Sequence, residues 1–227
     1  NCVPEAFLSR NPQFCRSALA AYTPRDFIAL VERHGIGYHE KTLGQLFCDG
    51  RAEQIIEMLR RECDTAGVRW AMPARIERVA QCENAGFEVT TTQGVFRSAA
   101  VVVATGGLSI PKIGATPFGY RLAEQFGLPV VTTRPALVPL AAAPDWLARF
   151  GALAGASFDT VASCAGQEFR ESALITHRGL SGPAILQVSS YWQFAGGGAT
   201  VELDLLPGRD AGAWLARHRR SQQLLGT

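Results

Sequence analysis

The chain has 227 residues, of which 47% are hydrophobic and 19% charged, a composition typical of a globular protein with a sizeable core and not of a disordered chain. Its 22 basic and 20 acidic residues leave a formal net charge of only +2. No electrostatic signature of nucleic-acid binding stands out, so we expect no nucleic-acid partner.

The longest uncharged run, residues 179–201, raises the question of a membrane span. It contains Pro183, several serines and glutamines and the triple glycine 196–198, which suit a lipid-facing helix poorly. The N-terminus carries Glu5 and no apolar core segment, unlike a secretion signal. The six cysteines form no CxxC pair and are expected to be reduced thiols. We therefore expect a cytoplasmic protein without a membrane span, and the absence of a starting Met suggests a piece of a longer protein.

Two helices are predicted in the first part of the chain. Thr23 can cap the first, Pro24 fits its first turn, Asp26 suits its positive end, and Gly35 ends it. The second begins near Asp49 and stops at Gly67.

After this glycine the period changes from helical to alternating. Short strands are predicted at residues 68–72, 75–82, 87–92 and 95–100. The three β-branched residues Val101–Val103 then predict a buried parallel strand, and this strand delivers the small residues Ala104, Thr105, Gly106 and Gly107. Glycine permits positive φ and lets backbone N–H groups reach a phosphate or ribose. The corner therefore indicates close approach of a nucleotide-bearing ligand, although a glycine pair after a strand also occurs as a plain tight turn.

The second half of the chain is richer in Ala, Pro and Gly, and strand-like segments dominate it. Thr116-Pro117 repeats the capping pattern of Thr23-Pro24, so Thr116 is expected to cap a helix that ends at Gly127. A domain boundary is placed near Arg134. Beyond it, strands are predicted at 136–140, 157–165, 168–176 and 200–205, and short helices at 184–192 and 210–219.

Several motifs occur in a fixed order along nearly the whole chain. They are ATGGLSIPKIGATPFGY from residue 104, RPALVPL from 134, LITHRGLSGPAILQVSS from 174 and LDLLPGRD from 203. This series resembles the bacterial flavoprotein family that includes BaiN-type bile-acid reductases and aminoacetone oxidase-like proteins, which are NAD(P)/FAD-dependent oxidoreductases.

The resemblance implies an α/β fold with two parts. Residues 1–134 would form a partial glutathione reductase-like FAD-binding domain with a β-meander, and residues 135–227 a β-rich inserted second domain. The backbone of Arg75 and Ile76 would lie beside the adenine, and Ala104–Gly107 would pass along the dinucleotide. The protein would be a FAD-dependent oxidoreductase that acts on a small molecule, with NAD(P)H as a possible electron donor.

His177 is the candidate general acid, because it lies in a polar loop flanked by glycine and not in a periodic apolar element. The alternative is structural, with the imidazole hydrogen-bonded to the backbone of its loop. His34 and His39 invite a metal interpretation, but their order does not match HExxH and the glycines between them would break the required helix, so no metal is expected.

The sequence also departs from the family pattern. A GxGxxG turn for the pyrophosphate does not occur in it, and Gln45, Cys48 and Pro117 stand where the family carries arginine, proline and glycine. One alternative is a non-catalytic remnant or binding module that keeps the fold without a complete FAD site. Another is an α/β enzyme that uses only NAD. The substrate, the electron acceptor and the oligomeric state are left open.

Overall fold

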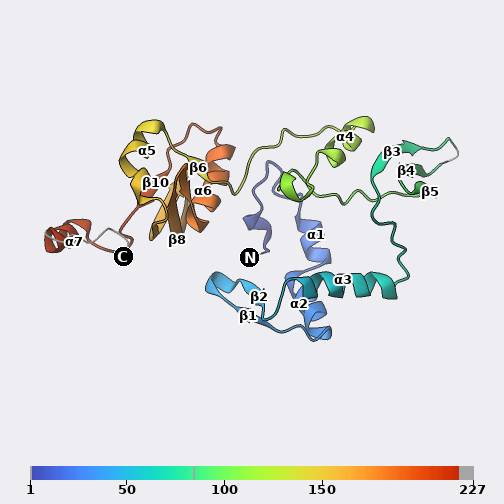
Figure 1. Cartoon of the computed structure of the whole chain (residues 1–227), viewed down its shortest axis with the longest axis horizontal. Helices are drawn as coiled ribbons and strands as arrows, with labels where there is room; N and C mark the ends of the chain where they lie inside the picture. The colour runs from blue at the N-terminus through green and yellow to red at the C-terminus, as the bar shows by residue number, and fades with distance from the viewer. Residues whose placement is uncertain (1, 84, 220–227) are drawn as a thin grey trace. The chain divides into compact units, whose positions relative to one another are not determined.

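The computed structural model describes residues 2–83 and 85–219, which fall into two compact units, Asn1–Val130 and Val131–Thr227 (Figure 1). The boundary predicted at Arg134 lies close to this division. The elements of the first unit are α1 (Arg16–Ala21), α2 (Pro24–Arg33), β1 (Tyr38–Glu40), β2 (Leu46–Cys48), α3 (Glu53–Thr65), β3 (Ile76–Gln81), β4 (Phe87–Thr91), β5 (Gly94–Ser98), α4 (Phe118–Gln125) and the 3-10 turns Pro4–Ala6, Thr42–Gly44 and Pro111–Ile113.

The elements of the second unit form a sheet with helices beside it. They are β6 (Leu140–Ala141), α5 (Pro144–Phe150), the 3-10 turn Gly151–Leu153, β7 (Ser157–Cys164), β8 (Gln167–Thr176), β9 (Gly179–Ser181), α6 (Pro183–Phe194), β10 (Glu202–Asp204) and α7 (Ala211–His218).

Helix α2 begins with the predicted cap. The backbone N–H of Asp26 donates to Thr23 Oγ1 at 3.3 Å, and the backbone N–H of Thr23 donates to Asp26 Oδ2 at 2.8 Å. These reciprocal bonds form a capping box, which satisfies two N–H groups that the first helical turn leaves unpaired. Gly35, at φ +65°, follows the C-cap, so both ends of this helix are as predicted.

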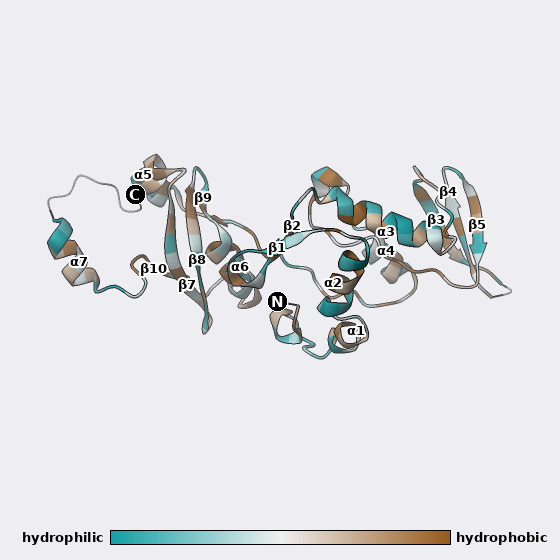
Figure 2. Cartoon of the chain, turned by 90° about the horizontal axis from the view of Figure 1, so that it is seen from below, coloured by the Kyte–Doolittle hydropathy of each residue, from teal (hydrophilic) through white to brown (hydrophobic). Residues whose placement is uncertain are grey.

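The core of the first unit lies between α2 and α3. Leu30 and Val31 from α2 pack with Ile36 and with Met58 of α3, which is 1% exposed. Figure 2 shows hydrophilic and hydrophobic residues interleaved along both helices, the pattern of helices that are buried on one side only. The predicted second helix is confirmed, but it begins at Glu53, four residues beyond the expected start at residue 49.

Strands β3, β4 and β5 form the predicted antiparallel meander, in that order. The chain turns at Gln93-Gly94, and Gly94 has a φ of +121°. Helix α4 is attached to this sheet because Gln125 Nε2 donates to the carbonyl oxygen of Val79 at 2.7 Å. Its N-cap is Pro117 without a side-chain cap bond, so the predicted cap by Thr116 is not formed.

Two predicted strands are absent from the first unit. Residues 68–72 are irregular, and Val101–Val103 form neither a strand nor a buried segment, since the side chain of Val102 is 88% exposed. A strand requires a hydrogen-bonded neighbour, and no described strand runs beside either segment. All strand pairs in the described residues are antiparallel, so the predicted buried parallel strand is wrong for this chain.

The second unit is built on a five-stranded antiparallel sheet in the order β10-β7-β8-β9-β6, with α6 packed on β7 and β8 (Figure 1). Ala184 and Val188 of α6 meet Ala162 and Cys164 of β7 in a core without exposed side chains. The strands predicted at 157–165, 168–176 and 200–205 and both helices are confirmed.

The segment before β6 is held by a helix and not by a strand. Ser189 Oγ on α6 accepts a hydrogen bond from the backbone N–H of Val138 at 3.0 Å, and Ser190 Oγ accepts one from that of Leu137 at 3.1 Å. These hydroxyls replace a strand neighbour, so the strand predicted at 136–140 is reduced to Leu140–Ala141. Within the described residues, no helix is long and apolar enough to cross a membrane.

Candidate functional site

The glycine corner Ala104–Gly107 precedes α4 and is exposed along its whole length. Gly106 has a φ of +67°, and nothing lies within 4 Å of the position that a Cβ would take there. Gly107 is different, because a Cβ on it would lie 2.8 Å from the hydroxyl oxygen of Tyr120. Gly106 therefore offers open main chain to a ligand, whereas a neighbouring side chain accounts for the small residue at 107.

The first turn of α4 approaches this corner closely. A Cβ on Gly119 would lie 3.1 Å from Thr105 Oγ1, so the small residue lets the helix come near the loop. Sequence reasoning missed both Gly119 and Tyr120 as neighbours of the corner. The available signal was Gly119 inside a helical segment. Glycine lowers the stability of a helix, so its presence there often indicates close packing against a neighbouring segment.

Arg75 and Ile76 lie at the start of β3, an edge strand of the meander. The backbone N–H of Arg75 donates to Thr92 Oγ1 at 3.0 Å, and its carbonyl oxygen accepts from the backbone N–H of Thr92 at 3.0 Å. Ile76 pairs with Thr91, and a bulge follows it before Arg78. Both polar backbone groups of Arg75 are thus used within the sheet. Its side chain is exposed, and Arg75 Nη2 lies 3.9 Å from Glu77 Oε1.

The proposed dinucleotide contacts come from two separate segments of the first unit. In the described part of the chain, no hydrogen bond or ion pair joins Arg75 or Ile76 to the corner at 104–107. The corner fits a ligand that needs bare main chain at Gly106, and the sequence contributes no GxGxxG turn for a pyrophosphate. The residues present therefore fit part of a dinucleotide site.

His177 lies in the turn between β8 and β9 and is exposed. Its imidazole makes no hydrogen bond to any described residue, so the structural alternative, in which the ring holds the loop backbone, is not realised. The turn is held by Thr176, whose Oγ1 accepts from the backbone N–H of Arg178 at 3.2 Å and donates to the carbonyl oxygen of Gly179 at 3.0 Å.

The two histidines that raised the metal question are each paired with a carboxylate. His34 Nε2 lies 2.7 Å from Glu62 Oε1, which links the end of α2 to α3, and His39 Nδ1 lies 2.7 Å from Asp49 Oδ1. Within the described residues, no group of three or more His, Cys, Asp or Glu side chains could hold a metal ion.

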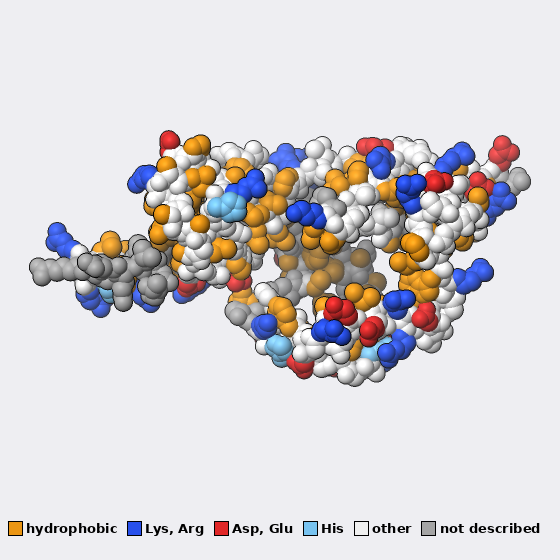
Figure 3. Space-filling view, viewed as in Figure 1, with side chains coloured by type: hydrophobic (Ala, Val, Ile, Leu, Met, Phe, Trp, Pro, Cys, Tyr) orange, Lys and Arg blue, Asp and Glu red, His pale blue; other side chains and the backbone are white. Residues whose placement is uncertain are grey.

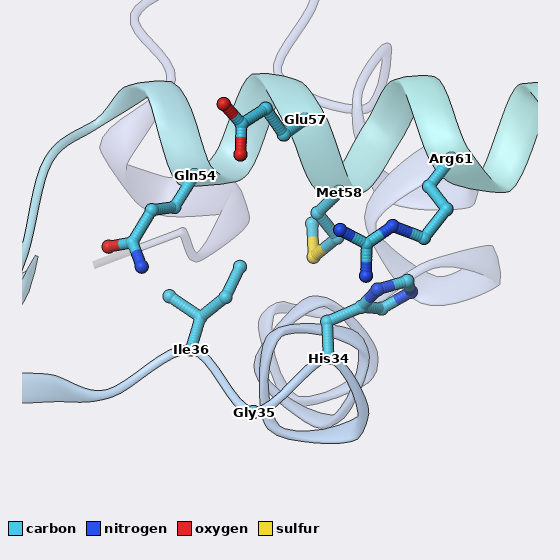
Figure 4. Close-up of a pocket in the computed structure, with 7 residues that line it drawn as sticks. All are labelled: His34, Gly35, Ile36, Gln54, Glu57, Met58 and Arg61. Atoms are coloured by element: carbon cyan, nitrogen blue, oxygen red, sulfur yellow. The ribbon is translucent and has the colours of Figure 1, made fainter.

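A shallow pocket of about 110 Å³ opens between the end of α2 and α3 (Figure 4). Met58 and Ile36 form its apolar side, and Arg61 extends toward His34. Sites for drug-sized ligands and cofactors typically measure about 300 Å³ or more, so this pocket is too small for a dinucleotide.

Residues 1–205 match the model of the HI0933-like protein Rossmann domain. The chain belongs to this family. Membership supports a flavoprotein with a Rossmann-like α/β domain and FAD as its cofactor, whereas the specific glutathione reductase-like arrangement stays a prediction.

The chain is also similar to two curated proteins named ribosomal RNA dihydrouridine synthase. It is 48% identical over 219 residues to the protein of Escherichia coli K12, a match that covers 96% of this chain and 54% of the relative. It is 45% identical over 232 residues to the protein of Haemophilus influenzae Rd, covering 99% of this chain and 56% of the relative. The chain thus spans about half the length of the curated relatives it matches.

These relatives correct two expectations. The family is supported, but the relatives do not carry the BaiN name that the sequence motifs indicated. The expected absence of a nucleic-acid partner is contradicted, because the name of both relatives specifies ribosomal RNA. The physical reason for the error is that a net charge of +2 is a sum over the whole chain. Contact with RNA phosphates depends on cationic side chains at the contact itself, which this sum does not report.

Proposed function

We propose that the full-length protein containing this chain is a FAD-dependent enzyme that reduces uridine in RNA to dihydrouridine. The observation that carries the proposal is the 48% identity over 96% of the chain to a protein named ribosomal RNA dihydrouridine synthase. Membership of a flavoprotein family agrees with this reaction, which is a reduction.

Conversion of uridine to dihydrouridine saturates the C5–C6 double bond of the base. The ring gains a hydride on one carbon and a proton on the other, and a reduced nicotinamide that is oxidised in the same cycle balances the electrons. FAD, when bound, would supply the hydride to the base. The protein has to hold the cofactor and the base and to deliver one proton.

The cofactor contacts that we propose lie in the first unit. Gly106 presents its backbone without a neighbouring atom at the Cβ position, and Ala104, Thr105 and Gly107 continue this exposed main chain. Arg75 and Ile76 would lie beside the adenine at the start of β3, which is an edge strand, although the backbone groups of Arg75 are already paired with Thr92. Exposed backbone of this kind suits a polar ligand that contacts main chain.

The proton donor that we propose is His177. Its imidazole is exposed on a turn and makes no hydrogen bond to a described residue, so both ring nitrogens are available to a substrate. A ring nitrogen of an imidazole can donate a proton to a substrate within hydrogen-bond reach, which suits general acid catalysis.

The proposal is tested by purifying the full-length protein and measuring its visible flavin absorbance. An unmodified ribosomal RNA transcript and reduced nicotinamide are then added, and dihydrouridine is quantified by mass spectrometry of the digested RNA. A coloured protein that forms dihydrouridine supports the proposal. A colourless protein that FAD does not stabilise would favour the alternative of a non-catalytic binding module.

A further inference from the structure

Arg178 follows the proposed proton donor directly, in the turn between β8 and β9. Its side chain is exposed, and none of the carboxylates in the described part of the chain forms an ion pair with it. The guanidinium carries five N–H donors, and no described residue accepts a hydrogen bond from them.

The backbone that carries this side chain is held on both sides. The N–H of Arg178 donates to Thr176 Oγ1 at 3.2 Å, and its carbonyl oxygen accepts from the N–H of Ala142 at 3.0 Å. The next residue, Gly179, is buried and pairs with Ala141 of β6. The turn is therefore fixed by its neighbours, while the cationic group at its tip is free to bind a ligand.

Three other arginines of the second unit are used within the protein. Arg170 Nη2 lies 3.5 Å from Asp159 Oδ2, and Arg134 Nη1 donates to the carbonyl oxygen of Gln193 at 2.7 Å. Arg217 Nε donates to the carbonyl oxygen of Ala213 at 3.3 Å. Arg178 differs from these three because it combines an uncompensated charge, a fixed backbone and a position next to His177. Figure 3 shows Lys and Arg side chains reaching the visible surface among hydrophobic ones, without a single broad basic patch.

We propose that Arg178 binds a backbone phosphate of the RNA substrate and thereby positions the reacting uridine at His177. This inference rests on the proposed function, and it assigns Arg178 as a positioning residue for the same reaction. A guanidinium matches the geometry of a phosphate with two parallel hydrogen bonds, and phosphate contacts fix the register of a nucleic acid on a protein. A phosphate held by Arg178 would keep the attached nucleotide within reach of the neighbouring imidazole.

The test compares full-length Arg178→Gln with Arg170→Gln as a matched control, since the control removes a cation already paired with a carboxylate. Binding of a fluorescein-labelled, unmodified ribosomal RNA transcript is measured by anisotropy at several salt concentrations. We expect Arg178→Gln to weaken binding about tenfold. We also expect it to lower the slope of log affinity against log salt by about 0.7 to 0.9, the value for one phosphate contact, while Arg170→Gln leaves both unchanged.

A second variant and a kinetic readout separate positioning from a merely structural role. Arg178→Lys keeps the charge, so it should retain the salt slope while losing part of the affinity. Arg178→Gln should raise KM more than it lowers kcat, and thermal unfolding should be unchanged in both variants because the side chain is exposed.

The inference would be overturned if Arg178→Gln bound RNA with the affinity and the salt slope of the wild-type protein. It would also be overturned if Arg178→Gln and Arg170→Gln lost RNA affinity equally. In either case, continued dihydrouridine formation by the wild-type protein would leave the proposed function standing. A wild-type protein that neither binds nor reduces RNA would overturn both.

Discussion

Gly179 lies so close to Leu140 on the neighbouring strand β6 that a Cβ on the glycine would collide with the leucine carbonyl oxygen. The glycine also has a φ of +141°, a conformation that residues with a side chain rarely adopt. Gly179→Ala should therefore destabilise the second unit by about 2 to 4 kcal/mol, through backbone strain and overpacking together. Urea unfolding monitored by tryptophan fluorescence would measure this loss.

A suitable control for this substitution is Gly166→Ala in the turn between β7 and β8. Gly166 also has a positive φ, +76°, but nothing lies within 4 Å of its Cβ position. The control should therefore cost only the backbone strain, about 1 kcal/mol. Equal losses of stability in the two variants would mean that the contact with β6 contributes nothing.

The capping box of α2 gives a prediction that depends on pH. Hydrogen bonds from the side chain and the backbone of Thr23 hold the pKa of Asp26 below its usual value of 3.8. A carboxylate whose pKa is lowered in the folded state stabilises the folded state at pH values above its unfolded-state pKa. This stabilisation is lost as the pH falls through the folded-state pKa. Thr23→Ala should thus cost about 1 kcal/mol near neutral pH through loss of the cap, and less in acid.

This dependence is measured as the difference in urea midpoint between Thr23→Ala and the wild-type protein from pH 7 down to pH values below 3.8. Thr23→Ser keeps the hydroxyl and serves as the control. A difference that stays constant over the whole range would show that the carboxylate of Asp26 takes no part in the cap.

The features predicted correctly from the sequence are those with local causes. The Thr23 cap, the glycine after α2 and the turn at Gln93-Gly94 depend on residues a few positions apart, and all of them are present. The prediction for Val101–Val103 failed because a strand exists only with a partner, and the sequence of one segment does not name that partner.

In the candidate site too, features with local causes were predictable and features that depend on distant parts of the chain were not. The exposed glycine corner at Gly106 was predictable from residue type, since few other residues accept a positive φ. The approach of Tyr120 to Gly107 was not, because it depends on how α4 folds back on the loop. The ribosomal RNA in the relatives' names was not expected, because a net charge of +2 on this chain does not show whether single charged side chains are unpaired.

Met58 is the most deeply buried side chain in the core between α2 and α3, with 1% exposed. Met58→Ala should lower the free energy of unfolding of the first unit by about 2 to 5 kcal/mol, since it removes buried volume that the helices cannot fully refill. Ile56 on the same helix is 58% exposed, so Ile56→Ala should change the stability by no more than about 0.5 kcal/mol. Denaturant titration of both variants makes the comparison, and similar losses would contradict the assigned core.

His177→Ala in the full-length protein should slow dihydrouridine formation more than it weakens flavin binding. The reason is that the imidazole is exposed and makes no hydrogen bond to a described residue, so its removal takes away a proton donor and no fold-stabilising contact. General acid catalysis typically contributes about 100-fold to 10,000-fold in rate, and the turnover number should fall within this range. Flavin content and RNA affinity are measured on the same preparation. Parallel loss of turnover and flavin would identify His177 as a structural residue.

Gly106 provides the sharpest test of where the cofactor lies. Gly106→Val places a branched side chain on the open side of the corner, where a dinucleotide in contact with main chain would have to lie. A dinucleotide displaced by this side chain would lose its contacts with the main chain, so flavin binding by the full-length protein should weaken about tenfold or more. Gly114→Val is the matched control, because Gly114 has a φ of +100°, lies in the same exposed loop region and has open space at its Cβ position. Equal flavin affinity in the two variants, measured by fluorescence quenching on titration with FAD, would place the cofactor away from the corner.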